Sequence, residues 1–469
     1  MVEDVFKEYG EIGINSLELA CGCAVKVDLE NVVYPAIREL RHRLPNKRFD
    51  IPSKRDAEIV AAGRKVEVHR RVYKLGFETD VDPNDIRSIN PQTCVAVFQV
   101  FQRYAGSREK FTELLEPVYK RISESGASLR FGKGHSIVTT SPEESIAIFD
   151  FITVREPITS KLLAINNDTV NIIDPTIGVG DRRQVIGALC NALNDLFVMG
   201  VHEELRVAPL IGVLDPSLRG KMIWHARNFS KELDFELLDV PQFNSRRLFI
   251  GATVLGTTDR QPPTREELVK PGMNVVVTRP FGELSPITVY VSSLLDNEVP
   301  SEVESKGIPL SELKCMKEKA VEIISSHNLR AAKVVSKYLP KIGEKFNVEE
   351  HIPLASDISG PGIYIFAEIA DRTNTSIEVS EVPLLFPEVS EYAAERFLMV
   401  NATAGTNGAF CLITHENITE DVVKDFKRAG YSPHIIGKVK EAGLAKVRMP
   451  KEVLKYVTNI ANPIIEVND

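Results

Sequence analysis

The chain of 469 residues has little of what marks secreted, membrane or nucleic-acid-binding proteins. Its six cysteines are too few for a disulfide framework in so long a chain. No apolar run approaches the roughly 18 residues that cross a bilayer. Residues 1–13 lack the basic start and apolar block of a signal peptide. The net charge of −8 argues against a general nucleic-acid binder, which is normally basic. We therefore expect a cytoplasmic protein that binds neither membrane nor nucleic acid.

The composition is that of a globular protein, with 43% hydrophobic and 26% charged residues. The length allows two or three domains. We predict a mobile arm over residues 1–30, a polar, helical insertion over 31–130, a first lobe over 131–270 and a second lobe over 271–469. The insertion holds a basic stretch from Lys47 to Lys74, which we interpret as a solvated helix face rather than a binding patch.

The hydrophobic pattern after residue 130 predicts a mixture of strands and helices. In the first lobe it predicts strands over 135–140, 145–154, 162–170, 207–214 and 248–255, and helices over 182–200 and 216–234. In the second lobe it predicts a strand over 274–278, helices over 311–325 and 329–339, and further alternation of strands and helices. This pattern indicates α/β or α+β layers and does not separate the two.

Three aspartates lie where a strand or helix offers a polar position. Asp168 interrupts an apolar strand, and Asp195 lies within the apolar face of a helix, where a buried carboxylate needs a partner. Asp357 occupies a compact turn that should introduce a helix, where it can cap the helix or hold a cation. Each alone is read as a cap or a satisfied core carboxylate. Together they offer the hard oxygen ligands that Mg²⁺ needs, with a bound triphosphate completing the set.

The run Cys21-Gly22-Cys23 is followed by Lys26, a cation that would lower the pKa of a nearby thiol and can pair with phosphate. Zinc needs about four ligands, and only two thiols occur here without a histidine-rich segment. The run indicates either nucleophilic or redox chemistry, or an inert exposed pair. The other four cysteines stand alone, as small buried hydrophobic residues do.

Glycine-containing turns are expected at 251–256, 278–282 and 406–409, where the backbone can approach a ligand or another strand. None matches a Walker loop or a Rossmann fingerprint. The sequence therefore predicts that any ATP site here differs from those two designs.

Taken in order, these motifs resemble the selenophosphate synthetase (selenide, water dikinase) family, within the superfamily of aminoimidazole ribonucleotide synthetase. Cys21-Gly22-Cys23 resembles the reactive loop of that family, and the segment 191–200, which includes Asn194 and Asp195, is similar to its Asn-Ala-(Leu/Ile/Val)-Ser-Asp-(Ile/Leu)-(Phe/Tyr)-Ala-Met-Gly helix. The three glycine turns and the segment 356–362 follow in the family's order.

The resemblance implies a two-lobed α/β (α+β) fold and a homodimer formed by the sheets of the first lobes. It implies ATP-dependent, Mg²⁺-assisted phosphorylation of selenide, or of sulfide, to selenophosphate or its sulfur analogue, with release of AMP and phosphate. By position, Cys21 and Lys26 are catalytic, and Lys26, Asp168, Asn194 and Asp195 contact the nucleotide. Asp168, Asp195 and Asp357 are the implied metal ligands, while either Cys21 or Cys23 can be the reactive thiol.

The chain departs from the family pattern at several positions. Lys26 lies three residues after Cys23, His135 stands where the family has a metal-binding aspartate, and 238–242 lacks the Gly-Gly-His segment. An Asp-Pro-Gln segment is replaced by Thr403-Ala404-Gly405. Two alternatives follow: another ATP-using enzyme of the superfamily with a carbon-based substrate, or a non-catalytic nucleotide-binding paralogue.

Overall fold

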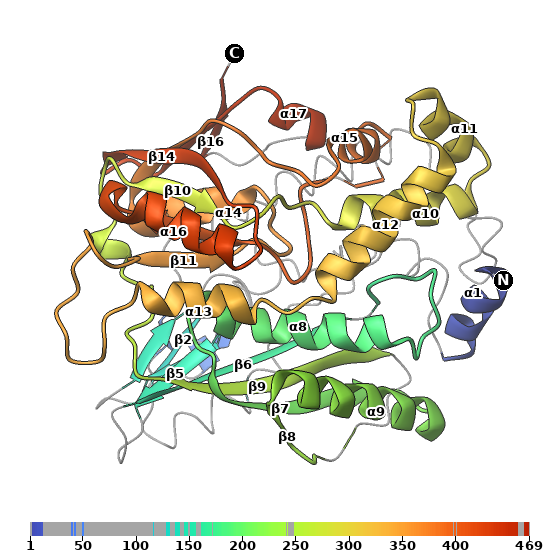
Figure 1. Cartoon of the computed structure of the whole chain (residues 1–469), viewed down its shortest axis with the longest axis horizontal. Coiled ribbons are helices and arrows are strands. Elements are labelled where there is room, and N and C mark those ends of the chain that lie inside the picture. Colours follow the sequence, from blue (N-terminus) through green and yellow to red (C-terminus); the bar gives the residue numbers. More distant parts are fainter. Residues whose placement is uncertain are drawn as a thin grey trace.

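The computed structural model describes residues 2–12, 39–40, 42–43, 49–50, 116, 128–131, 137–140, 145–148, 151–155, 161–170, 172–240, 242, 248–396, 398–399, 401–457 and 464–468. Two lobes built on separate sheets make up most of this part (Figure 1). A small third sheet has the order β1-β2-β3. Its strands are β1 (Phe49–Asp50), β2 (Ser128–Phe131) and β3 (Ile137–Thr140). No helix in the described ranges is long and apolar enough to cross a membrane.

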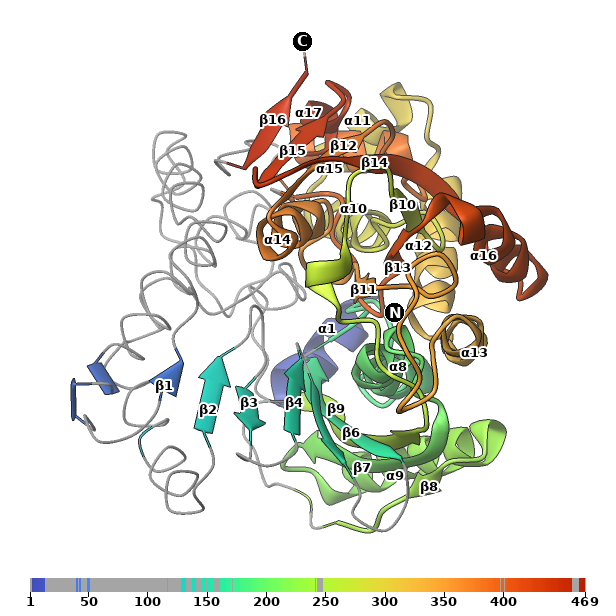
Figure 2. The same ribbon diagram turned by 90° about the vertical axis from the view of Figure 1, so that its left-hand side faces the viewer.

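The first lobe is a 6-stranded sheet in the order β4-β5-β6-β9-β7-β8. Its strands are β4 (Ser145–Ile148), β5 (Phe151–Arg155), β6 (Leu162–Val170), β7 (Glu203–Gly212), β8 (Glu236–Leu237) and β9 (Phe249–Thr258). All neighbours are antiparallel except β7 and β8. Helices α8 (Arg182–Val198) and α9 (Pro216–Leu233) contact this sheet and each other (Figure 2).

Helix α8 is the central element, because it lies between the first sheet and the second lobe. Asp181 caps its first turn by accepting a hydrogen bond from the backbone N–H of Arg183 at 2.8 Å. Gly200 has a φ of 75°, which allows the chain to turn away from the helix after its last turn. Most of its side chains are buried, including the polar residues Asn191 and Asn194. A helix that is covered on nearly all sides has to place such polar groups against partners.

The second lobe is a 7-stranded sheet in the order β11-β13-β10-β14-β12-β15-β16. Its strands are β10 (Asn274–Val277), β11 (Leu354–Asp357), β12 (Thr375–Val379), β13 (Phe410–Thr414), β14 (His434–Ala442), β15 (Lys446–Met449) and β16 (Ile465–Val467). Every residue of β10 and β13 is buried. Successive side chains of a strand point to opposite faces, so this sheet is covered on both.

The remaining helices surround these sheets (Figure 1). They are α1 (Val2–Glu11), α10 (Leu284–Leu295), α11 (Glu298–Ser305), α12 (Leu310–Ile324), α13 (Leu329–Lys337), α14 (Tyr364–Thr373), α15 (Pro387–Glu395), α16 (Glu416–Arg428) and α17 (Val453–Tyr456), with a 3₁₀ turn, η3 (Glu266–Leu268).

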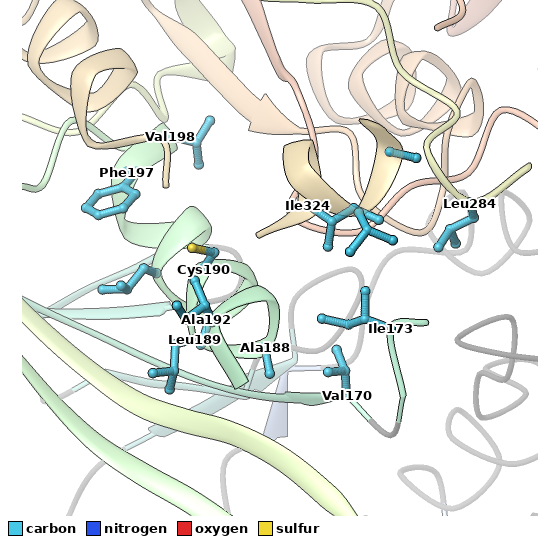
Figure 3. Close-up of a cluster of buried hydrophobic side chains, with 14 of the residues drawn as sticks. Val170, Ile173, Ala188, Leu189, Cys190, Ala192, Phe197, Val198, Leu284 and Ile324 are labelled. Carbon is cyan, nitrogen blue, oxygen red and sulfur yellow. The ribbon is translucent and has the colours of Figure 1, made fainter. Parts of the chain in front are cut away.

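One hydrophobic cluster runs through both lobes. It includes Val170 of β6, Ala188 of α8, Ile324 of α12 and Phe410 of β13. Figure 3 shows part of it, in which Ile324 and Leu284 of the second lobe belong to the same cluster as Ile173 and the side chains of α8. A second cluster covers the other face of the second sheet, against α14. The two lobes therefore share a core, which fixes how they sit against each other.

Most predicted elements are present, with three corrections. The strand expected over 145–154 is a hairpin of β4 and β5. The glycine turn expected at 251–256 lies inside β9, where a Cβ on Gly251 would come within 2.0 Å of the carbonyl oxygen of Asp168. The prediction that the backbone approaches another strand here is thus confirmed, and the prediction of a turn is wrong. Helices α10 and α11 were not predicted.

Candidate active site

Four polar side chains join β6 to α8 in a reciprocal arrangement. Asn191 Nδ2 donates to Asp168 Oδ2 at 2.6 Å, and Asn166 Nδ2 donates to Asp195 Oδ2 at 2.6 Å. Residues 166 and 168 share one face of the strand, and 191 and 195 share one face of the helix. Two strand residues span about 6.6 Å and four helix residues about 6 Å, so the two spacings match. Strand and helix each supply one aspartate and one asparagine.

The surroundings fix both carboxylates. Asn166 is 5% exposed and also donates to the carbonyl oxygen of Ala192 at 2.9 Å, which locks its amide. Asp168 Oδ1 accepts from the backbone N–H of Thr169 at 2.7 Å. The amide donors orient the carboxylates and add no charge of their own. Asn166 is therefore one partner of Asp195, whose carboxylate is partly buried on α8.

Asp357 enters the site from the second lobe. It is the last residue of β11 rather than the cap of a helix, since α14 begins only at Tyr364. Ser359 Oγ donates to Asp357 Oδ2 and accepts from the backbone N–H of Gly408, the latter at 3.2 Å. A Cβ on Gly408 would lie 2.5 Å from the carbonyl carbon of Ile358, so only glycine permits this approach.

A hydrogen-bonded path connects the two lobes. The backbone N–H of Asn407 donates to Asn191 Oδ1 at 2.9 Å, and Asn194 Nδ2 donates to the carbonyl oxygen of Gly408 at 3.2 Å. Asp168 therefore lies at one end of the path and Asp357 at the other. The turn predicted at 406–409 is confirmed, with Asn407 at φ 51°. Asn194, predicted to contact nucleotide, is fully buried and serves this lobe contact.

The remaining predicted site residues, Cys21 and Lys26, lie outside the described residues, as does His135. The segment before them begins as helix α1, although residues 1–30 were expected to form an arm. Tyr9 of α1 is fully buried, accepts from Gln184 Nε2 at 2.6 Å and donates to the carbonyl oxygen of Ile177 at 2.9 Å.

A buried ion pair near the site was not predicted. Lys317 Nζ contacts Asp174 Oδ2 at 2.8 Å, and the two side chains are 2% and 0% exposed. Burial alone would lower the pKa of Lys317, but the charge of Asp174 and hydrogen bonds to Asp174 and Glu318 raise it above the ordinary value. The pair ties α12 to the loop after β6. No local pattern marks it, because the two residues are 143 positions apart.

No family model matches the chain. It is 23% identical over 294 residues to a selenide, water dikinase of Methanocaldococcus jannaschii, an alignment that covers 61% of this chain and 80% of that protein. The chain is thus a distant homologue of selenide, water dikinase, which confirms the resemblance found from the motifs.

Solved structures resemble this chain over part of its length. The protein tt0281 of Thermus thermophilus has a TM-score of 0.46 and 15% identity, covering 64% of this chain and 88% of its own. Thiamine monophosphate kinase of Aquifex aeolicus has a TM-score of 0.43 and 16% identity, covering 64% and 90%. The two-sheet architecture itself confirms the predicted mixed α/β class.

Proposed function

We propose that this chain is an ATP-dependent phosphotransferase that transfers a phosphoryl group to a small chalcogen nucleophile, selenide or sulfide. Water is the further reactant, and the products are the chalcogenophosphate, AMP and phosphate. Its homology to a selenide, water dikinase supports the reaction class. The observation that carries the proposal is the reciprocal Asp–Asn pairing of β6 and α8, joined through Asn407 to Asp357 of the second lobe.

The oxygen donors of Asp168, Asp195 and Asp357 suit Mg²⁺, which prefers carboxylate and phosphate oxygens. Among the described residues, no three His, Cys, Asp or Glu side chains gather into a metal cluster by themselves. A bound triphosphate and water would complete the coordination, as is usual for Mg²⁺ in kinases. When bound, the ion supplies neutralisation of phosphate charge. The three carboxylates would hold the nucleotide's metal-bound phosphates between the lobes.

Cys21 is the proposed reactive thiol, with Lys26 as a cation that favours the thiolate or pairs with phosphate. Tyr9 anchors α1 to the loop between Asp168 and α8. Cys21 follows Glu11 by ten residues, a length of chain that reaches at most about 35 Å. The anchored helix therefore leaves Cys21 enough chain to reach the strand that carries Asp168.

A homodimer through the first sheet is also proposed. On β7 and β9, Ala208, Leu210, Thr253 and Leu255 are only partly buried and alternate with buried residues, on the sheet whose other face carries α8 and α9. Ala208 lies opposite Thr253 in the register of the two strands. A sheet face of such side chains is suited to packing on a second copy of itself.

The test is product analysis after incubation of the protein with ATP and Mg²⁺, with and without anaerobic selenide or sulfide, followed by phosphorus NMR. We expect nucleophile-dependent AMP and a new chalcogenophosphate signal, reduced at least about 100-fold in Asp168→Asn and in Cys21→Ser. Asp215→Asn is the matched control, because Asp215 caps α9 and asparagine caps equally well. ATP left intact by the wild-type protein under all conditions would refute the proposal.

A second candidate is another ATP-using enzyme that acts on a carbon-based substrate. It is favoured by Gln242, which lies in the segment that aligns with the missing Gly-Gly-His. Gln242 Oε1 accepts from the backbone N–H of Ile211 at 2.8 Å and its Nε2 donates to the carbonyl oxygen of Pro209 at 2.9 Å, so it clamps β7 instead of facing a ligand. Full turnover by Cys21→Ser on such a substrate would favour this candidate.

A further inference from the structure

Asn407 has an unusual combination of conformation and burial. Its φ of 51° lies in the left-handed region, which costs a residue other than glycine roughly 1–2 kcal/mol. It is fully buried in the turn that precedes β13. Its neighbour Gly408 shows that glycine is available in this turn, where the backbone requires it. The side chain of Asn407 therefore needs a reason beyond backbone geometry.

The contacts of Asn407 supply that reason, since every polar group of the residue is used. Its side-chain Nδ2 donates to the carbonyl oxygens of Ile324 at 2.8 Å and Ser326 at 2.6 Å, at the end of α12. Its backbone N–H donates to Asn191 Oδ1 at 2.9 Å, and its carbonyl oxygen accepts from Arg279 Nη2 at 2.7 Å. The residue thus joins α8, the end of α12 and the segment before α10.

A second amide supports the first. Asn328 Nδ2 donates to Asn194 Oδ1 at 2.7 Å and lies 3.4 Å from Asn407 Oδ1. Asn328 Oδ1 accepts in turn from Tyr431 Oη at 3.2 Å. Because these groups are buried, an unmatched donor or acceptor would cost about 1–3 kcal/mol. The network therefore favours the one arrangement of the two lobes in which these donors and acceptors are matched.

Both ends of this network reach a carboxylate of the candidate active site. From the backbone N–H of Asn407, the path runs through Asn191 to Asp168. From the next peptide N–H, that of Gly408, it runs through Ser359 to Asp357. The dipeptide Asn407-Gly408 thus lies between two carboxylates that come from different lobes.

We propose that Asn407 is a positioning residue that sets the separation of Asp168 and Asp357. This inference rests on the proposed function, in which these carboxylates bind the metal–nucleotide complex. Its amide holds the dipeptide against the end of α12, and the two backbone N–H groups of the dipeptide then fix one carboxylate each. In this role Asn407 acts on the carboxylates through Asn191 and Ser359.

The test compares Asn407→Gly with Asn374→Gly. Asn374 has the same φ of 51° and ends α14 in the second lobe, so its replacement by glycine matches the backbone effect away from the network. Manganese binding in the presence of a non-hydrolysable ATP analogue is followed by electron paramagnetic resonance, and thermal unfolding is measured in parallel. We expect the metal dissociation constant to rise about 10–100-fold in Asn407→Gly, the range seen when an outer partner of a ligand is lost. Asn374→Gly should bind as the wild type does.

Ser359→Ala provides the second variant, because it breaks only the link between Gly408 and Asp357. Its effect on manganese binding should be less than additive with that of Asn407→Gly, since both act on one path. Wild-type binding by Asn407→Gly, or full additivity, would overturn the inference. Absence of metal–nucleotide binding in the wild-type protein would instead overturn the proposed function. If Asn407→Gly does not fold, a Ser359→Ala variant with wild-type binding still refutes the proposed path.

Discussion

Replacing Lys317 by methionine should strongly destabilise the protein. Lys317 Nζ lies 2.8 Å from Asp174 Oδ2, 2.7 Å from Glu318 Oε1 and 3.1 Å from Thr176 Oγ1. Methionine fills much of the same volume but leaves Asp174, which is fully buried, without its cation. Removing one partner of a buried pair costs about 3–5 kcal/mol. We expect the free energy of unfolding to fall by that amount.

Equilibrium unfolding in urea provides the assay. Far-UV circular dichroism follows the whole chain, and the fluorescence of Trp224, the single tryptophan, follows α9. Coincident transitions would justify a two-state treatment. The control is Lys337→Met, because Lys337 pairs with Asp425 while 62% exposed, and such a surface pair contributes about 0–1 kcal/mol.

One double variant and the pH dependence of stability test the ion pair further. Lys317→Met combined with Asp174→Asn removes both charges and should recover most of the lost stability. The raised pKa of Lys317 stabilises the fold below its unfolded value of about 10.4, and this contribution is lost as the pH rises through the folded value. The gap between wild type and Lys317→Met should therefore shrink above pH ~10.5. A single variant within about 1 kcal/mol of wild type at pH 7 would refute the importance of the pair.

Three further outcomes are expected. Gly405→Ala should reduce the free energy of unfolding in urea by about 1–3 kcal/mol, because the added Cβ would lie 2.0 Å from Oε2 of the fully buried Glu283. Gly220→Ala is the control, because the space around its Cβ in α9 is open, and it should be neutral or raise the free energy of unfolding by up to about 1 kcal/mol. Among the described thiols, a thiol reagent should label Cys315 and spare the two others, whose pKa values burial raises; fast labelling of all three by mass spectrometry would contradict the core packing. Leu210→Arg should convert a dimer to monomers in light scattering, and an unchanged mass would argue against the proposed dimer face.

Local patterns in the sequence determined much of the architecture. The apolar stretch of β6 with its polar interruption, the capped helix α8 and the alternating pattern of β7 are fixed by neighbours within a few residues. The sequence also indicated that Asp195 needs a partner, because a carboxylate on an apolar helix face is costly when unpaired. The order of the motifs identified the homology to selenide, water dikinase.

Only the tertiary structure decided which residues pair with these buried polar side chains. Asn166 meets Asp195, Asn407 meets Asn191 and Lys317 meets Asp174 across separations of 29, 216 and 143 residues. Nothing local specifies such pairs, because each depends on how separate elements pack in the folded chain. Tertiary packing likewise explains the glycines within β9, since a Cβ on Gly251 would meet the backbone of β6 and one on Gly256 would meet the side chains of Val201, Leu205 and Leu196. The sequence was sufficient to predict the carboxylates. The amides that orient them could be identified only from the contacts between distant elements of the folded chain.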